Sequence, residues 1–379
     1  MTRGNTMNKE PIRILHVIGV MHHGGAETMI MNFYRHIDRT KVQFDFVENE
    51  GMVADFDEAI RALGGRIYHC PRYRGRNHFR YVAWWKQFLA EHGGEYKAVH
   101  GHIGSTASIY LKLARDAGIY TIAHSHNTAF FDLKGMVYQM YAYPTRFVAD
   151  CFFGCSLEAG ISRYGKRICS DPRKFRMLNN AIETERFAFN PEIRERMRRE
   201  LGVADKMVIG HIGRFATQKN HVFLLKIFEQ IHHANPDTCL LLVGDGELRG
   251  KIEEQAARAG LTDSVIFAGI HNDVSMFYQA MDVFVLPSLF EGLGIVGIEA
   301  QTAGLPCVIS DGVARECIRT KDLVTVCRLD QTAEQWADHI LERCGQPRED
   351  HSQEIRDNGF DIVQTTQWLE NFYINAGEA

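Results

Sequence analysis

Short apolar runs alternate with amphipathic stretches along most of the chain. The run 12–18 is rich in β-branched residues and ends at Gly19, and the following stretch 26–37 has apolar residues at helical spacing. This order predicts a strand, a glycine loop and a helix. Similar units recur in both halves, and strands that alternate with helices of about 10–15 residues indicate parallel sheets covered on both faces.

The pattern predicts five strands in each half. They are 12–18, 44–47, 66–68, 98–100 and 121–123 in the first half, and 208–212, 239–243, 265–267, 283–286 and 307–309 in the second. We therefore expect an α/β chain with two Rossmann-like, doubly wound parallel-sheet domains. Residues 10–182 form the first domain and 183–359 the second, while 360–379 is a helix that packs back on the first. Ligands bind at the carboxyl ends of such strands.

Composition narrows the class of protein. The 379 residues are 45% apolar and 24% charged, which is typical of globular proteins. No apolar run approaches the roughly 18 residues of a membrane span, and the first ten residues lack the apolar block of a signal peptide. The nine cysteines include no CxxC pair. We expect a cytoplasmic protein with reduced thiols, either free or peripheral on the membrane.

Charge is distributed unevenly. Residues 1–183 hold 24 Lys and Arg against 17 Asp and Glu, whereas 184–379 hold 19 against 30, and the net charge is −4. A basic half favours an anionic partner such as a phosphate or a membrane surface, and the overall acidity argues against duplex nucleic acid. Two domains with unlike solvated surfaces explain the same counts equally well.

The loops after the predicted strands of the second half carry candidate chemistry. Arg214 and Lys219 follow the strand 208–212, where together they can neutralise a diphosphate. Gly244 and Gly246 flank an acid after the next strand and form either a plain turn or a backbone surface for a nucleoside.

The strongest signal is the segment 287–300, in which Glu291 and Glu299 are eight residues apart around a glycine-rich loop. A loop of this kind at a helix start exposes backbone amides to a ligand. Glu299 lies in an apolar stretch, where a solvated acid is unexpected, and carboxylates accept hydrogen bonds from sugar and ribose hydroxyls.

The first half offers weaker signals. Gly24 and Gly25 precede a predicted helix and form either a phosphate loop or a tight turn. The pairs His100/His102 and His124/His126 each face one side of a strand, which suits zinc, but no third ligand is apparent. The Asp55-Phe56-Asp57 segment has metal-binding spacing but is predicted to enter a helix on the surface.

Two basic clusters remain. One carries Arg72, Arg74, Arg76 and Arg80, and the other spans 163–176. They are either ordinary solvated surface or contacts to a lipid diphosphate or anionic headgroups.

Five motifs together carry a resemblance to a known family. They are Gly24-Gly25-Ala26-Glu27, Gly213-Arg214-Phe215 with Lys219-Asn220, Gly244-Asp245-Gly246, Glu291 with Glu299, and the segment 304–311. In this order and spacing they resemble the retaining glycosyltransferases of family 4, in the capsular or exopolysaccharide branch. Asn180-Ala181 departs from the Asn-Gly common there, which affects the interdomain stretch and not the chemistry.

The resemblance implies the GT-B fold, in which two such domains face a cleft. It assigns catalysis to Arg214, Lys219, Glu291 and His102, with Arg214 and Lys219 on the donor phosphates and Glu291 on the donor sugar. It assigns donor binding to Gly24, Gly25, Gly213, Gly244, Gly246, Leu293, Gly294, Ile295 and Glu299, and Glu299 receives the ribose hydroxyls. His124 and His126 are further polar contacts at a strand end.

The implied activity is hexosyl transfer from a nucleotide sugar, with UDP-sugars favoured, to a saccharide or lipid-linked saccharide acceptor in surface polysaccharide synthesis. No metal and no cofactor is required for it. The alternatives are a GT-B sugar-nucleotide epimerase, which needs no acceptor, and a non-catalytic subunit that binds sugar nucleotides.

Overall fold

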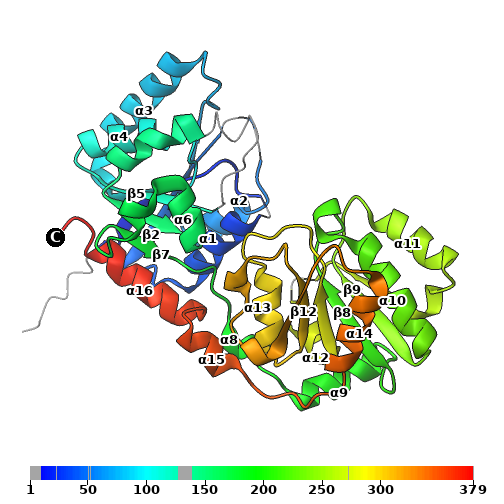
Figure 1. The fold of residues 1–379 in the computed structure, drawn as a ribbon. Helices are drawn as coiled ribbons and strands as arrows, with labels where there is room; N and C mark the ends of the chain where they lie inside the picture. The colour runs from blue at the N-terminus through cyan, green and yellow to red at the C-terminus, as the bar shows by residue number, and fades with distance from the viewer. Residues whose placement is uncertain are drawn as a thin grey trace, which may run out of the picture. The chain divides into compact units, whose positions relative to one another are not determined.

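The computed structural model describes residues 10–378 apart from 23, 50, 52, 127–138 and 272. The chain forms two compact units (Figure 1). The first comprises Met1–Ala181 and Ile362–Ala379, and the second comprises Ile182–Asp361.

The first unit is built on a seven-stranded parallel sheet with the order β3-β2-β1-β4-β5-β6-β7. The order reverses between β1 and β4, which makes the sheet doubly wound. Its strands are β1 (Ile12–Val17), β2 (Val42–Asn49), β3 (Ile67–Cys70), β4 (Tyr96–Gly101), β5 (Tyr120–Ser125), β6 (Cys151–Gly154) and β7 (Phe175–Met177).

Helices cover both faces of this sheet because successive strand residues point to opposite sides. In β1, Ile14 joins one buried cluster and Leu15 the other. The helices are α1 (Gly25–His36), α2 (Asp57–Ala62), α3 (His78–His92), α4 (Ala107–Asp116), α6 (Leu157–Tyr164), α7 (Lys166–Cys169) and α16 (Ile362–Ile374). The last of these, α16, packs against α1 and buries Leu369 and Tyr373 (Figure 1).

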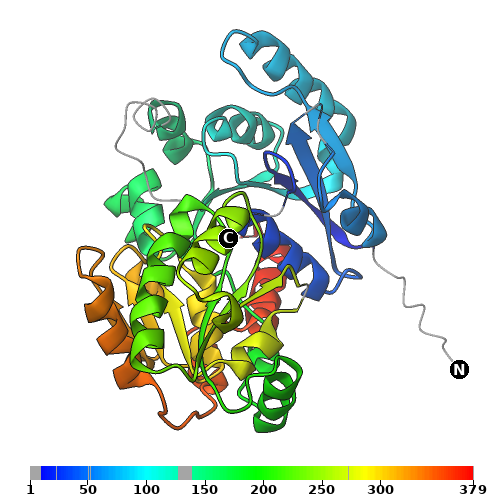
Figure 2. The ribbon, with the colours of Figure 1, turned by 90° about the vertical axis from the view of Figure 1, so that its right-hand side faces the viewer.

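The second unit has a six-stranded parallel sheet with the order β10-β9-β8-β11-β12-β13. Its strands are β8 (Met207–Ile212), β9 (Thr238–Val243), β10 (Val265–Gly269), β11 (Val283–Leu286), β12 (Cys307–Ser310) and β13 (Val324–Cys327). Its helices are α8 (Thr184–Phe187), α9 (Pro191–Glu200), α10 (His221–Ala234), α11 (Arg249–Arg258), α12 (Ser275–Ala280), α13 (Ile295–Thr302), α14 (Ala333–Arg343) and α15 (Ser352–Asp357). They lie on both faces of the sheet (Figure 2).

The predicted fold class, two doubly wound parallel sheets, is confirmed. The hydrophobic pattern missed β6, β7 and β13, which are short strands of three or four residues. Asp57 begins α2, as expected for a segment that enters a helix, but the surface position expected for it is wrong, because its side chain is buried. None of the helices in the described part of the chain is both long and apolar enough to cross a membrane.

Candidate functional site

Lys219 and Glu291 form an ion pair at the carboxyl edge of the second sheet. Lys219 ends the 3₁₀ turn Thr217–Lys219 after β8, and Glu291 lies on the loop after β11. Lys219 Nζ lies 2.6 Å from Glu291 Oε1, and the two side chains are only 17% and 10% exposed. Because both groups are mostly shielded from solvent, salt screens this pair less than a surface pair.

Hydrogen bonds set the positions of the two loops independently of this charge pair. Ser288 Oγ donates to Glu291 Oε1 at 2.9 Å, and the Glu291 amide donates to the carbonyl of Gly312 at 2.9 Å. Asn220 Nδ2 donates to the carbonyl of Pro287 at 3.2 Å, which ties the start of α10 to the loop after β11. Ser288 and Lys219 therefore both hold Glu291 Oε1, while the Gly312 carbonyl holds the Glu291 backbone.

Glu299 lies in the second turn of α13, where Tyr278 Oη donates to its Oε2 at 2.7 Å. Burial raises the pKa of Glu299 to about 7, against the opposing effects of the Tyr278 hydrogen bond and the charges of Lys219 and Arg186. The carboxyl therefore changes its protonation near neutral pH.

The start of α13 follows directly from the loop that carries Glu291. Gly294 precedes this helix with a φ of 68°, a left-handed conformation that favours glycine. Leu293 and Ile295 on either side are half-buried. The first amides of a helix have no partner within the helix, so this start can donate to an anion.

Arg214 lies apart from the buried pair. Its side chain is 74% exposed and forms a 3.1 Å ion pair with Glu247, on the loop after β9. The sequence paired Arg214 with Lys219, whereas the structure pairs Lys219 with Glu291. The binding of a diphosphate by Arg214 stays a prediction. It requires the ligand to take the place of Glu247 beside the Arg214 guanidinium.

Gly213, Gly244 and Gly246 allow two loops to pack backbone against backbone. The Gly213 amide donates to Val243 O and the Phe215 amide to Asp245 O, both at 3.0 Å. Gly244 has a φ of 135°, and a Cβ there would lie 2.2 Å from the Gly213 carbonyl oxygen. A Cβ on Gly246 would lie 2.6 Å from Phe215 O. These glycines are therefore needed for the loops themselves, whatever the loops bind.

At the start of α1, the side chain of Glu27 folds over Gly24. A Cβ on Gly24 would approach Glu27 Oε2 to 2.3 Å, whereas one on Gly25 would meet nothing within 4 Å. Burial raises the pKa of Glu27, although its backbone hydrogen bond opposes the shift. An acidic group thus occupies the helix start where the resemblance places a diphosphate.

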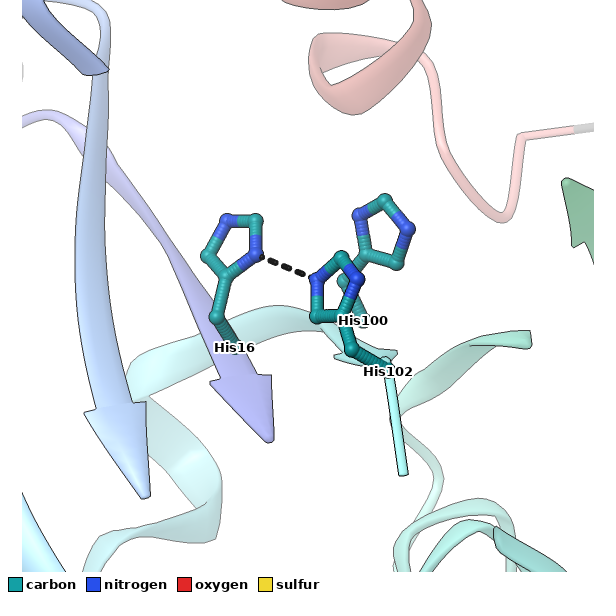
Figure 3. A group of neighbouring side chains, drawn as sticks. All are labelled: His16, His100 and His102. Atoms are coloured by element: carbon teal, nitrogen blue, oxygen red, sulfur yellow. Dashed lines mark hydrogen bonds between the residues drawn. The ribbon is translucent and has the colours of Figure 1, made fainter. Parts of the chain in front are cut away.

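Five histidines gather in the first unit. His102, His124 and His126 lie with His16 of β1 and His100 of β4, and His16 and His100 are register partners. Figure 3 shows His16 facing His102 across a hydrogen bond, with His100 beside it. The His16 Nδ1–His102 Nε2 distance is 3.0 Å, and the His102 Nδ1–His126 Nε2 distance is 2.8 Å.

The second part of this cluster runs from Tyr373 of α16 to His124. Tyr373 Oη lies 2.7 Å from His100 Nδ1, and His100 Nε2 lies 3.2 Å from His124 Nδ1. The sequence analysis missed His16, although it stands on a predicted strand, because pairing of β1 with β4 had not been inferred. Burial lowers the pKa of His16 to about 3 and of His126 to about 4, so the rings are neutral at pH 7.

Arginines from the first basic cluster line a pocket of about 780 Å³ in the first unit. Arg72, Arg74, Arg76 and Arg80 meet Asn49 there, together with Gly19, Val20 and Asn77. Gly19 and Asn49 mark the carboxyl ends of β1 and β2. Among the described residues Arg72, Arg74 and Arg76 have no ion pair, and the pocket lining includes no acid. The stretch 163–176 contributes nothing to this lining.

Comparison with known proteins places the chain among sugar transferases. Residues 206–345 match a family model described as "Glycosyl transferases group 1". The chain is 35% identical over 377 residues to EpsF of Bacillus subtilis (strain 168), which is named as a glycosyltransferase, and the match covers 97% of each chain. It is 31% identical over 237 residues to the Escherichia coli UDP-Gal:alpha-D-GlcNAc-diphosphoundecaprenol alpha-1,3-galactosyltransferase, covering 59% of this chain and 60% of that one.

Solved structures show the same fold. Anabaena HepE in complex with UDP superposes with a TM-score of 0.77 at 18% identity, covering 95% of this chain and 99% of that chain. WaaG, a glycosyltransferase involved in lipopolysaccharide biosynthesis, superposes with a TM-score of 0.63 at 17% identity, covering 96% and 97%.

Proposed function

Because this chain belongs to the group 1 glycosyltransferases and has their two-sheet GT-B fold, we propose that it is a retaining hexosyltransferase. It moves a sugar from a nucleotide-sugar donor, with UDP-sugars favoured, to a lipid-linked saccharide in surface polysaccharide synthesis. The observation that carries this proposal is the shielded Lys219–Glu291 pair at one sheet edge, where the charge of Lys219 also acts on Glu299.

The donor binds at the carboxyl edge of the second sheet. The ribose hydroxyls donate to Glu299, whose second oxygen remains held by Tyr278. The donor sugar hydroxyls donate to Glu291, and Lys219 is already positioned by that carboxylate. Such prior positioning means that the site reorganises little when the substrate arrives.

Bond cleavage at the anomeric carbon leaves negative charge on the departing nucleoside diphosphate. Lys219 and the amides at the start of α13 stabilise that charge as it develops, and this is the main source of rate enhancement. Arg214 joins them when the ligand displaces Glu247. The leaving phosphate takes the proton of the acceptor hydroxyl, so the mechanism requires neither a dedicated base nor a cofactor.

The acceptor's phosphates bind in the arginine pocket of the first unit. Arg72, Arg74 and Arg76, which have no ion pair within the described part of the chain, repel one another, and a diphosphate relieves that repulsion while it accepts paired hydrogen bonds. The Escherichia coli relative is named for an acceptor that carries a diphosphoundecaprenol, which has this chemistry. A lipid-linked acceptor would hold the enzyme at the cytoplasmic face of the membrane.

A panel of nucleotide sugars, each tested with and without a lipid-diphosphate saccharide, tests the proposal. Bound donor raises the melting temperature by mass action, which identifies the sugar and the base. Chromatography then follows the nucleotide products. Nucleoside diphosphate that appears only with acceptor supports transfer. A sugar nucleotide that changes its sugar without acceptor would establish an epimerase, and donor binding without any product would establish a binding subunit.

A further inference from the structure

The proposed transfer gives no step to the histidine cluster of the first unit, and the catalytic role that the resemblance implies for His102 stays a prediction. His102, His124 and His126 each bring a ring nitrogen within 4.8 Å of one from each of the others. They come from the carboxyl ends of β4 and β5, so two neighbouring strands hold all three in place. The sequence alone contains two His-x-His pairs. The sheet brings His102 of the first pair close to His124 and His126, which form the second pair.

We propose that His102, His124 and His126 bind one divalent transition-metal ion of the zinc class. Imidazole nitrogen suits Zn²⁺ and the ions that resemble it, whereas Mg²⁺ and Ca²⁺ require oxygen ligands. Three histidines are a sufficient protein ligand set for zinc, and they leave a fourth position for water. His102 and His126 are half-buried while His124 is buried, so the set opens toward the rim of the sheet.

An unpartnered buried nitrogen supports this site. His124 is 3% exposed, and its Nε2 has no hydrogen-bond partner among the residues that the structure describes. A buried polar atom without a partner destabilises the folded state. Because this atom belongs to the proposed ligand set, coordination would remove that destabilisation.

The hydrogen bonds that link Tyr373, His100 and His124 can select the His124 tautomer that binds a metal. If His100 Nδ1 donates to Tyr373 Oη, His100 Nε2 is free to accept from His124 Nδ1. His124 Nε2 then carries a lone pair. A second residue that orients a metal-binding imidazole in this way is common at zinc sites. His16 would act likewise on His102, by accepting from its Nε2.

The His102 and His126 rings must move apart slightly to admit an ion. Ligand nitrogens at about 2.0–2.1 Å from a tetrahedral ion lie about 3.3 Å apart. His102 Nδ1 and His126 Nε2 are 2.8 Å apart in the structure. The two rings must therefore separate by about half an ångström, at the half-buried rim of the cluster, to admit an ion. The site uses no acid, which distinguishes it from an adventitious surface site.

Metal analysis of untagged protein tests the proposal without any sugar nucleotide. The protein is stripped with a chelator, incubated with Zn²⁺ or Co²⁺, desalted and analysed by mass spectrometry. We expect about one equivalent per chain in the wild type. The His69→Ala variant is the control and should bind equally, because His69 is an exposed histidine on β3 outside the cluster.

Variants then assign the ligands. His126→Ala, at the half-buried rim, and His124→Gln should each lose the ion. His16→Gln should weaken binding about 10–100-fold, as expected for a residue that only orients a ligand. The Co²⁺ form should show the intense visible absorption of a tetrahedral site.

Absence of bound metal in the wild type, or an unchanged equivalent in His126→Ala, would overturn the site. If His124→Gln fails to fold, His126→Ala still decides. Because no step measures transfer, failure of this site leaves the proposed function intact, and loss of transferase activity says nothing about the metal.

Discussion

Lys219 Nζ lies 2.6 Å from Glu291 Oε1 and joins the loop after β8 to the loop after β11. Both loops leave the same edge of the sheet, although the residues are 72 positions apart in the chain. The pair supplies a cation whose position is set before a substrate arrives. Its proposed task is to stabilise the leaving diphosphate, which makes Lys219 the first residue to change.

Replacement of Lys219 by Ala should lower kcat by about 10²–10³-fold with a much smaller effect on the KM for the donor, because the lysine acts on charge that develops during bond cleavage. Steady-state kinetics with the identified donor measures both values. Lys226→Ala, which removes an exposed lysine from α10, is the matched control. Wild-type turnover in Lys219→Ala would refute the leaving-group role.

Replacement of Glu299 by Gln should make the protein more stable at pH 8 and should weaken binding of UDP. The pKa of Glu299 rises from about 4.5 to about 7 on folding, so the folded state binds more protons between these values and stability falls as pH rises through them. Gln stays neutral and avoids this loss, which amounts to about 3 kcal/mol at most. Unfolding by urea at pH 5 and pH 8 measures it. The stability difference between Glu299→Gln and the wild type should be clearly larger at pH 8, and an equal difference at both pH values would contradict the raised pKa.

Acid should destabilise the first unit through its histidines. Folding lowers the pKa of His16 from about 6.5 to about 3 because burial disfavours the charged ring, so the unfolded chain binds more protons below pH 6.5. Stability should therefore fall as pH decreases from 6.5 to 4. Unfolding of chelator-treated protein across this range tests it, with His16→Phe expected to show a shallower decrease. An identical slope in both proteins would contradict this account.

Replacement of Arg72, Arg74 and Arg76 by Ser should raise the KM for a lipid-diphosphate acceptor at least tenfold while donor binding stays unchanged. The effect should shrink at high salt, because the arginines contribute electrostatic attraction. Ser substitutions at Lys86, Lys112 and Lys174 remove the same charge from exposed positions outside the pocket. An equal rise in the acceptor KM in both triple variants would show that overall charge, and not the pocket, accounts for the effect.

The Gly244→Ala substitution should destabilise the second unit. The φ of 135° alone costs alanine about 1–3 kcal/mol, and the contact of the added Cβ with the Gly213 carbonyl adds to that cost. Gly250→Ala is the control, since Gly250 lies within α11 with nothing within 4 Å of an added Cβ. That substitution should stabilise by about 0.5–1 kcal/mol. Urea unfolding distinguishes the two signs.

Much of the fold could be predicted because strand and helix periods are local properties. The runs at β1, β8 and β11 are apolar and β-branched, and each was found. By contrast, β7 contains only Phe175–Met177 and depends on pairing with β6, which no local pattern records.

The candidate site was predicted less completely. The spacing of Glu291 and Glu299 pointed to a ligand, but their partners Lys219 and Tyr278 come from other parts of the chain. A contact across β1 and β4, such as that between His16 and His102, can be predicted only when the order of the strands in the sheet is known. Arg214 shows the converse, because a sequence position at a strand end does not determine where a long side chain points.

Transfer of a radiolabelled sugar from the stabilising UDP-sugar to a lipid-diphosphate saccharide tests the central claim most directly. The account predicts labelled lipid product with one UDP released per sugar transferred, and the anomeric configuration of the donor retained in that product. Labelled lipid of inverted configuration, or consumption of the donor at the same rate without acceptor, would contradict it.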